Sequence, residues 1–174
     1  MSRKIKAIQT VYKGHKFRSR LEARWAVFFD ELNIEWMYEP EGYELNDGSW
    51  YLPDFYLPHF NKGLYCEVKF DGGDFSKARM FNETTKLGML ECEGTPDHCG
   101  YQLNEHGTDM YGVFHYKYLS KFECRLFVDE WSNLGKHSEG SKVWLEDSSC
   151  YHRESIINAV LKAKQERFEH RRRR

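Results

Sequence analysis

The 174-residue chain lacks any apolar run that approaches the length of a membrane span, and its first ten residues are basic without the apolar core of a secretory signal. It also lacks a disulfide framework, because its five cysteines are odd in number and irregularly spaced: Cys66, Cys92, Cys99, Cys124 and Cys150. These absences argue against a membrane protein and against a disulfide-stabilised secreted domain. We therefore expect a cytoplasmic protein with reduced cysteines and no membrane partner.

An overall excess of positive charge is lacking too, because 27 acidic residues balance 26 Lys and Arg. The balance hides a segregation along the chain. Residues 1–24 carry eight basic residues and one acid, residues 153–174 carry eight and three, and the middle carries 10 basic and 23 acidic residues. Basic ends suit phosphate binding, and an acidic middle suits metal binding. The alternative is that the ends are solvated tails, and for Arg171–Arg174 a disordered one.

No internal repeat or low-complexity linker divides the chain, and its length fits one domain with a sizeable core. We expect a single domain over residues 1–174. Its parts are a core at about 12–96, an elaboration at 97–150, and a C-terminal helix with a basic tail at 151–174.

Apolar periodicity and turn residues predict an α/β fold with a mixed sheet. The predicted core order is a helix from Ser19 to about Asn33, strands at 34–38, 51–57 and 65–70, a helix at 75–85 and a strand at 88–93. The connection between the last two strands is predicted to be a right-handed crossover. Lys13-Gly14 predicts a short hairpin or an extended arm, and Asn46-Asp-Gly48 predicts a turn between two short strands. Beyond the core we expect a hairpin with strands at 111–118 and 122–129, a short strand at 143–145, and a final helix at 155–168.

The predicted strand at 65–70 carries an acid and a lysine two residues apart. Side chains alternate along a strand, so Glu67 and Lys69 share one face. Cys66, Val68 and Phe70 take the other face, which suits a hydrophobic core. Taken alone the acid-x-lysine pattern is weak, because many exposed strands carry Glu and Lys for solubility.

Pro53-Asp54, in the preceding predicted strand, strengthens the pattern. If the two strands pair through the turn at 58–63, Asp54 lies beside Glu67. Two carboxylates that close repel unless a cation or a proton lies between them. Mg²⁺ prefers oxygen ligands and keeps several waters, so one or two carboxylates plus a substrate phosphate suffice to hold it. A lysine beside such an ion, here Lys69, stabilises charge on a phosphate or helps to hold the attacking water.

The combination of Glu22 on the first helix, Pro53-Asp54 and Glu67-Val68-Lys69 resembles the PD-(D/E)xK nuclease superfamily, with its restriction-endonuclease-like αβββαβ core. The acid on the first helix looks like that of phage-type junction-resolving endonucleases. The run Phe17–Trp25 also resembles small phage-encoded nucleases of this superfamily, and a phage-encoded protein would be found in the host cytoplasm. The resemblance covers roughly residues 12–96, and the hairpin and final helix are elaborations beyond it.

The resemblance implies a metal-dependent deoxyribonuclease that hydrolyses phosphodiester bonds and leaves 5′-phosphate and 3′-hydroxyl ends. Asp54 and Glu67 would be metal ligands, with the Val68 backbone carbonyl as a third. Glu22 would bind a second metal ion or orient the water, and Lys69 would polarise the nucleophile or the scissile phosphate. The implied cofactor is Mg²⁺, for which Mn²⁺ substitutes, and the implied partner is DNA.

Glu22 also has a purely structural interpretation, since Ser19-x-x-Glu22 is a capping box at the start of the helix. Basic residues near this helix start are candidates for contacts with DNA phosphates, with a solvated basic face as the alternative: Lys16, Arg18, Arg20 and Arg24. A zinc cluster is a further hypothesis, but its spacing matches no compact zinc knuckle: Cys92, His98, Cys99 and His106.

Three alternatives stay open at this point. A branched-DNA resolvase, a nickase or an exonuclease would use the same residues, and a resolvase favours a homodimer or a larger nuclease complex. A DNA- or protein-binding module would keep the fold and not the activity. A phage inhibitor of a host defence system would use the acidic middle as a nucleic-acid mimic.

Overall fold

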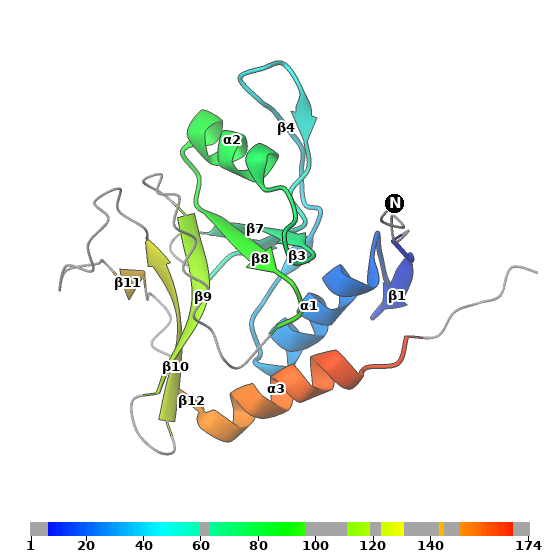
Figure 1. The fold of residues 1–174 in the computed structure, drawn as a ribbon, viewed down its shortest axis with the longest axis vertical. Helices are drawn as coiled ribbons and strands as arrows, with labels where there is room; N and C mark the ends of the chain where they lie inside the picture. Colours follow the sequence, from blue (N-terminus) through cyan, green and yellow to red (C-terminus); the bar gives the residue numbers. More distant parts are fainter. Residues whose placement is uncertain are drawn as a thin grey trace, which may run out of the picture.

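A computed structural model describes residues 7–59, 63–96, 111–118, 123–130, 143–144 and 150–168, with side chains at 7–59, 63–96 and 157–168. The described residues form a mixed α+β fold, in agreement with the predicted class (Figure 1). The main sheet runs in the order β11 (Val143–Trp144), β10 (Glu123–Glu130), β9 (Tyr111–Tyr118), β8 (Met89–Glu93), β7 (Leu64–Lys69), β6 (Phe55–Leu57) and β3 (Met37–Tyr38), and β12 (Cys150–His152) also pairs with β10.

The first helix, α1 (Arg20–Glu31), begins where the sequence predicts. Ser19 adopts an extended conformation at the N-cap, and its hydroxyl accepts a hydrogen bond from the Glu22 amide at 3.2 Å. The buried face of α1 is wider than the single apolar face that the periodicity predicts, because Ala23 and every residue from Trp25 to Phe29 are buried. The reason is that α1 packs both on the sheet and along the final helix, α3 (Arg153–Gln165) (Figure 1).

Helices cover both faces of the main sheet at strand β7. One face, with Cys66 and Val68 of β7, packs on α1 and α3. The other face, with Tyr65 of β7, packs on α2 (Ser76–Thr85) through Phe81. Alternate residues of β7 therefore enter two separate hydrophobic clusters, as the alternation of side chains along a strand requires. Because β7 and β8 are parallel and joined by α2, the predicted crossover unit is present.

The predicted strand at 51–57 is broken in two. β5 (Trp50–Tyr51) pairs with β4 (Tyr43–Glu44) in a small separate sheet, whereas β6 belongs to the main sheet. Pro53 lies between them and has no amide hydrogen for a strand ladder. The predicted turn at Asn46-Asp-Gly48 joins β4 to β5, and Gly48 has a φ of +75°. Similarly, only Met37–Tyr38 of the predicted strand at 34–38 pairs in the sheet.

Phe70 was predicted to face the core, and this is wrong, because its side chain is 69% exposed. Strand β7 ends at Lys69, and the Phe70 carbonyl accepts a hydrogen bond from the Gly73 amide at 2.8 Å. Phe70 therefore starts a turn, where the alternation of a strand no longer applies.

Two further hairpins agree with the sequence. β1 (Thr10–Tyr12) and β2 (His15–Phe17) flank Lys13-Gly14, which has positive φ at both residues as a tight hairpin turn requires. β9 and β10 form the predicted C-terminal hairpin, and β9 extends the main sheet by pairing parallel to β8. No helix in the described ranges has both the length and the apolar character needed to cross a membrane.

Candidate functional site

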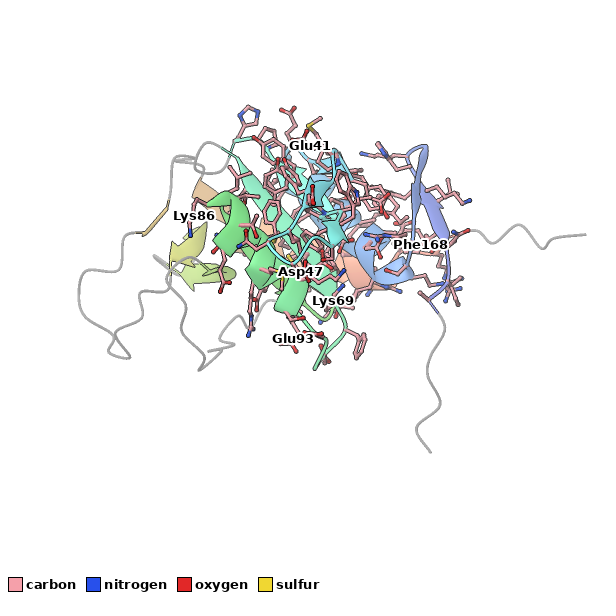
Figure 2. All side chains as sticks on the ribbon, turned by 90° about the horizontal axis from the view of Figure 1, so that it is seen from above. Glu41, Asp47, Lys69, Lys86, Glu93 and Phe168 are labelled. Carbon is pink, nitrogen blue, oxygen red and sulfur yellow. The ribbon has the colours of Figure 1, made fainter. Side chains whose placement is uncertain are left out.

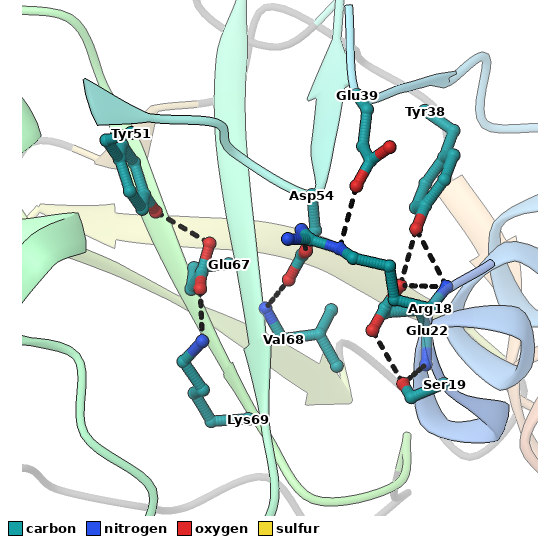
Figure 3. A network of polar contacts seen from close by, with 10 residues as sticks. All are labelled: Arg18, Ser19, Glu22, Tyr38, Glu39, Tyr51, Asp54, Glu67, Val68 and Lys69. Atoms are coloured by element: carbon teal, nitrogen blue, oxygen red, sulfur yellow. Dashed lines mark hydrogen bonds and ion pairs between the residues drawn. The ribbon is translucent and has the colours of Figure 1, made fainter. Parts of the chain in front are cut away.

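The two motifs meet at the beginning of β6. β6 and β7 are antiparallel, with Phe55 opposite Cys66, so that Asp54 continues the register opposite Glu67. The Asp54 amide donates to the Cys66 carbonyl at 3.0 Å, which extends the pairing to Asp54 itself. Figure 3 shows both carboxylates with the side chains that contact them. The predicted juxtaposition of these two acids is therefore present.

Glu67 is 5% exposed and has partners at both oxygens. The Tyr51 hydroxyl donates to Oε2 at 2.6 Å, and Nζ of Lys69 pairs with Oε1. Lys69 lies on the same face of β7 as Glu67, as predicted, and its side chain is 35% exposed. A partly exposed ammonium group beside a buried carboxylate can reach a ligand that approaches from solvent.

Asp54 is more deeply buried, at 2% exposure. Its Oδ2 accepts from the Val68 amide at 2.7 Å, and its Oδ1 accepts from Nη2 of Arg18 at 2.5 Å. Burial, followed by the charges of Glu67 and Glu22, raises the pKa of Asp54 to about 8, and the Val68 amide and Arg18 oppose this only in part. Burial is thus the first cause of the raised pKa of this carboxyl group, and neighbouring negative charge is the second.

Glu22 supplies the third acid and is 6% exposed. Its Oε1 accepts from the Ser19 hydroxyl at 2.7 Å, and its Oε2 accepts from the Tyr38 hydroxyl at 2.6 Å and from the Arg18 amide at 3.0 Å. The capping-box pair of Ser19 and Glu22 thus exists, although the carboxylate bonds to the Arg18 amide. Glu22 is held at the start of α1, and its charge still acts on Asp54.

The four basic candidates do not gather at one place. Arg18 lies at the site, where its Nε also pairs with Oε1 of Glu39 at 2.7 Å. Arg24 instead points to the C-terminal end of α3 and donates to the carbonyls of Ala163 and Lys164. Lys16 and Arg20 are exposed, on β2 and at the start of α1.

Arg24 also contacts an aromatic side chain that follows α3. The Arg24 guanidinium lies 5.9 Å from the ring centroid of Phe168, which in turn makes an edge contact with Tyr12 of β1. Figure 2 shows Phe168 beside the N-terminal elements. Arg24 therefore joins α1 to α3 in this structure.

Sequence reasoning missed three residues of the site: Tyr38, Glu39 and Tyr51. The sequence places Tyr51 only at the start of the predicted strand at 51–57, although a tyrosine buried in a strand usually needs a partner for its hydroxyl. Glu39 has a φ of +46°, and its amide donates to the Asp54 carbonyl at 2.9 Å. A left-handed backbone at a glutamate before a proline has no signal in the local sequence.

Asp54 and Glu67 are the acids placed to hold the expected metal ion. Asp54 and Glu67 offer carboxylate oxygens, which are the ligands that Mg²⁺ prefers, and two such groups suffice when water and phosphate complete the coordination. Within the described ranges, no group of three or more His, Cys, Asp or Glu side chains has an arrangement that would enclose a metal by itself. The Val68 amide donates to Oδ2 of Asp54, and the role of the Val68 carbonyl as a third ligand stays a prediction. The acids present thus fit an ion held by two carboxylates, not a closed cage.

The zinc hypothesis lies largely outside the described residues, because His98, Cys99 and His106 belong to the part of the chain that is not described. Cys92 is buried in β8, as predicted for a strand residue. Burial and the neighbouring Cys66 thiol raise the pKa of Cys92, which keeps it a neutral thiol.

No protein-family model, no curated protein and no solved structure matches this chain. The resemblance to PD-(D/E)xK nucleases therefore stays a prediction that depends on the residues named above.

Proposed function

We propose that this protein is a Mg²⁺-dependent DNA endonuclease of the PD-(D/E)xK type. It hydrolyses phosphodiester bonds and leaves a 5′-phosphate and a 3′-hydroxyl. The observation that carries the proposal is the pairing of Asp54 with Glu67 across β6 and β7, with Lys69 on the same face of β7. Three buried acids near one another are costly for stability, so their arrangement calls for a function that uses negative charge.

In the proposed site, Asp54 and Glu67 hold the divalent ion by their carboxylates. The ion, when bound, supplies the charge that makes water a sufficient nucleophile near neutral pH. Tyr51 orients Glu67, and the Val68 amide orients Asp54. Lys69 stabilises the charge that develops on the phosphate as the bond breaks. Glu22 holds the water or a second ion once one of its present partners moves away.

DNA is the proposed substrate, and Arg18 is the basic candidate best placed to meet a phosphate. It lies at the site with its side chain 52% exposed. Lys16 and Arg20 are exposed nearby in the sequence and extend the basic surface that precedes α1. Phosphate contacts of this kind supply affinity and salt dependence without reading the base sequence.

The test is cleavage of supercoiled plasmid and of a four-way junction in Mg²⁺, Mn²⁺ or EDTA. Wild type is compared with Asp54→Ala and with Glu83→Ala, a control that removes an exposed acid of α2. We expect metal-dependent cleavage by wild type and by Glu83→Ala, and none by Asp54→Ala.

The outcomes separate the alternatives. Preference for the junction identifies a resolvase, and a single nick in the plasmid identifies a nickase. Cleavage by purified Asp54→Ala at the wild-type rate would contradict the proposal. Tight DNA binding without cleavage in any metal would favour a binding module that keeps the fold and not the activity.

A further inference from the structure

Arg18 is placed between the acids of the site by contacts from both its backbone and its side chain. The Arg18 amide donates to Oε2 of Glu22 at 3.0 Å, and its guanidinium donates to Oδ1 of Asp54 at 2.5 Å. The same guanidinium pairs through Nε with Glu39 at 2.7 Å. Figure 3 shows Arg18 between Glu39, Asp54 and Glu22. One residue therefore contacts three acids.

The two oxygens of Asp54 differ in how easily they can exchange partners. Oδ2 is bonded to the Val68 amide, a backbone group fixed by strand β7. Oδ1 is bonded to a side chain that is half exposed and can rotate away. A divalent ion that binds Asp54 must therefore take the place of the guanidinium at Oδ1, since two cations cannot share that oxygen at close range.

Glu39 can hold the Arg18 guanidinium after such an exchange. Its backbone is anchored by the bond from its amide to the Asp54 carbonyl at 2.9 Å, and its φ of +46° directs the chain into Pro40. Its side chain is 26% exposed, against 4% for that of Asp54, so an ion pair with Glu39 costs less desolvation.

We propose that Arg18 is an internal counter-ion of Asp54 that a divalent metal ion displaces, and that Glu39 holds the displaced guanidinium. This inference rests on the proposed metal-dependent function and adds a positioning role for Arg18 and Glu39. Arg18 occupies Oδ1 of Asp54 in the metal-free protein and makes metal binding weaker than the acids alone would allow.

The test measures metal affinity without nucleic acid, by calorimetric titration of Mn²⁺ and of Mg²⁺ into the full chain. Arg18→Gln is compared with Lys16→Gln, which removes the same charge from an exposed site two residues earlier. We expect Arg18→Gln to bind metal about tenfold more tightly, the size of one charge-assisted hydrogen bond that no longer competes. Lys16→Gln should stay within about twofold of wild type, as expected for an exposed charge.

A double-mutant cycle separates this exchange from a general change in charge. Glu39→Gln should weaken metal binding about threefold in the wild-type background, because the displaced guanidinium has lost its acceptor. In the Arg18→Gln background the same change should have little effect. Equal weakening in both backgrounds would overturn the role of Glu39 as a partner of Arg18. If Arg18→Gln does not fold, Arg18→Lys replaces it. Arg18→Lys should bind metal more tightly than wild type and Lys16→Gln do, but by less than tenfold.

The two proposals fail in different ways. Metal binding by wild type and Arg18→Gln with equal affinity overturns the counter-ion role and leaves the nuclease proposal intact. Absence of metal binding in both proteins overturns the nuclease proposal and the counter-ion role with it. Binding by Arg18→Gln alone supports the counter-ion role in its strongest form.

Discussion

The Tyr51 hydroxyl lies 2.6 Å from Oε2 of Glu67, and both side chains are buried. Tyr51 comes from the small sheet of β4 and β5, whereas Glu67 comes from the centre of the main sheet. The hydrogen bond thus ties the small sheet to the candidate site. Burial, together with the charge of Glu67, raises the pKa of Tyr51, so the phenol stays protonated and remains a donor.

Tyr51→Phe should lower the free energy of unfolding by about 1–3 kcal/mol, because it leaves an oxygen of a buried carboxylate without its donor. Urea denaturation in EDTA measures the change. The same variant should cleave DNA more slowly, since Glu67 is no longer held in one orientation. Unchanged stability together with unchanged cleavage would show that the bond has no role.

Asp54→Asn should change how stability depends on pH. In the wild type the pKa of Asp54 is raised from 3.8 to about 8, so the folded state keeps a proton that the unfolded state releases. The stability from this group is fully present below about pH 4 and is lost as pH rises through about 8. In EDTA, Asp54→Asn should therefore gain stability relative to wild type from pH 5 to 8, by at most about 1.4 kcal/mol per pH unit.

At high pH, Mg²⁺ should make the wild type more stable than Asp54→Asn. Mg²⁺ binds the ionised acids of the wild type and stabilises the folded state by mass action, whereas Asp54→Asn has lost a ligand. Thermal unfolding at pH 8, with Mg²⁺ and with EDTA, measures both effects. A pH profile that is the same for wild type and Asp54→Asn would contradict the assignment of the buried charge to Asp54.

Lys69→Met should separate metal binding from catalysis. The ammonium group pairs with Glu67 but is not an expected metal ligand, so the variant should bind Mn²⁺ at least as tightly as wild type. Its cleavage rate should fall by about 10²-fold or more, because a charge that stabilises the transition state is absent. Lys77→Met, at an exposed position of α2, is the control and should cleave normally. Retained cleavage in Lys69→Met would remove Lys69 from the site.

Local patterns predicted those parts of the structure that depend on local physics. The helix start at Ser19, the alternation of Glu67 and Lys69 with the core residues, and the pairing of Asp54 with Glu67 all follow from capping, strand period and a short connection. The break at Pro53 was missed because the apolar residues on both sides of it look like one strand. It is this break that allows Tyr51 to approach Glu67 from another sheet.

The charge environment could not be predicted in the same way, because it depends on contacts between distant parts of the chain. Arg18 and Asp54 are 36 residues apart, and Arg24 and Ala163 are 139 apart. Three arginines of similar sequence context were therefore treated alike. The fold separates Arg18, at the acids, from Arg24, at the end of α3.

Arg24→Met tests this separation. The guanidinium donates to two carbonyls at the C-terminal end of α3, where helix carbonyls lack partners within the helix and carry partial negative charge. Loss of the donor should lower the free energy of unfolding by about 1–2 kcal/mol, and retention of the apolar stem limits the loss of packing. The dependence of DNA affinity on salt concentration should stay unchanged, because Arg24 is engaged within the protein. Lys16→Met provides the comparison for an exposed basic residue. A shallower salt dependence in Arg24→Met at unchanged stability would place Arg24 on the phosphate backbone instead.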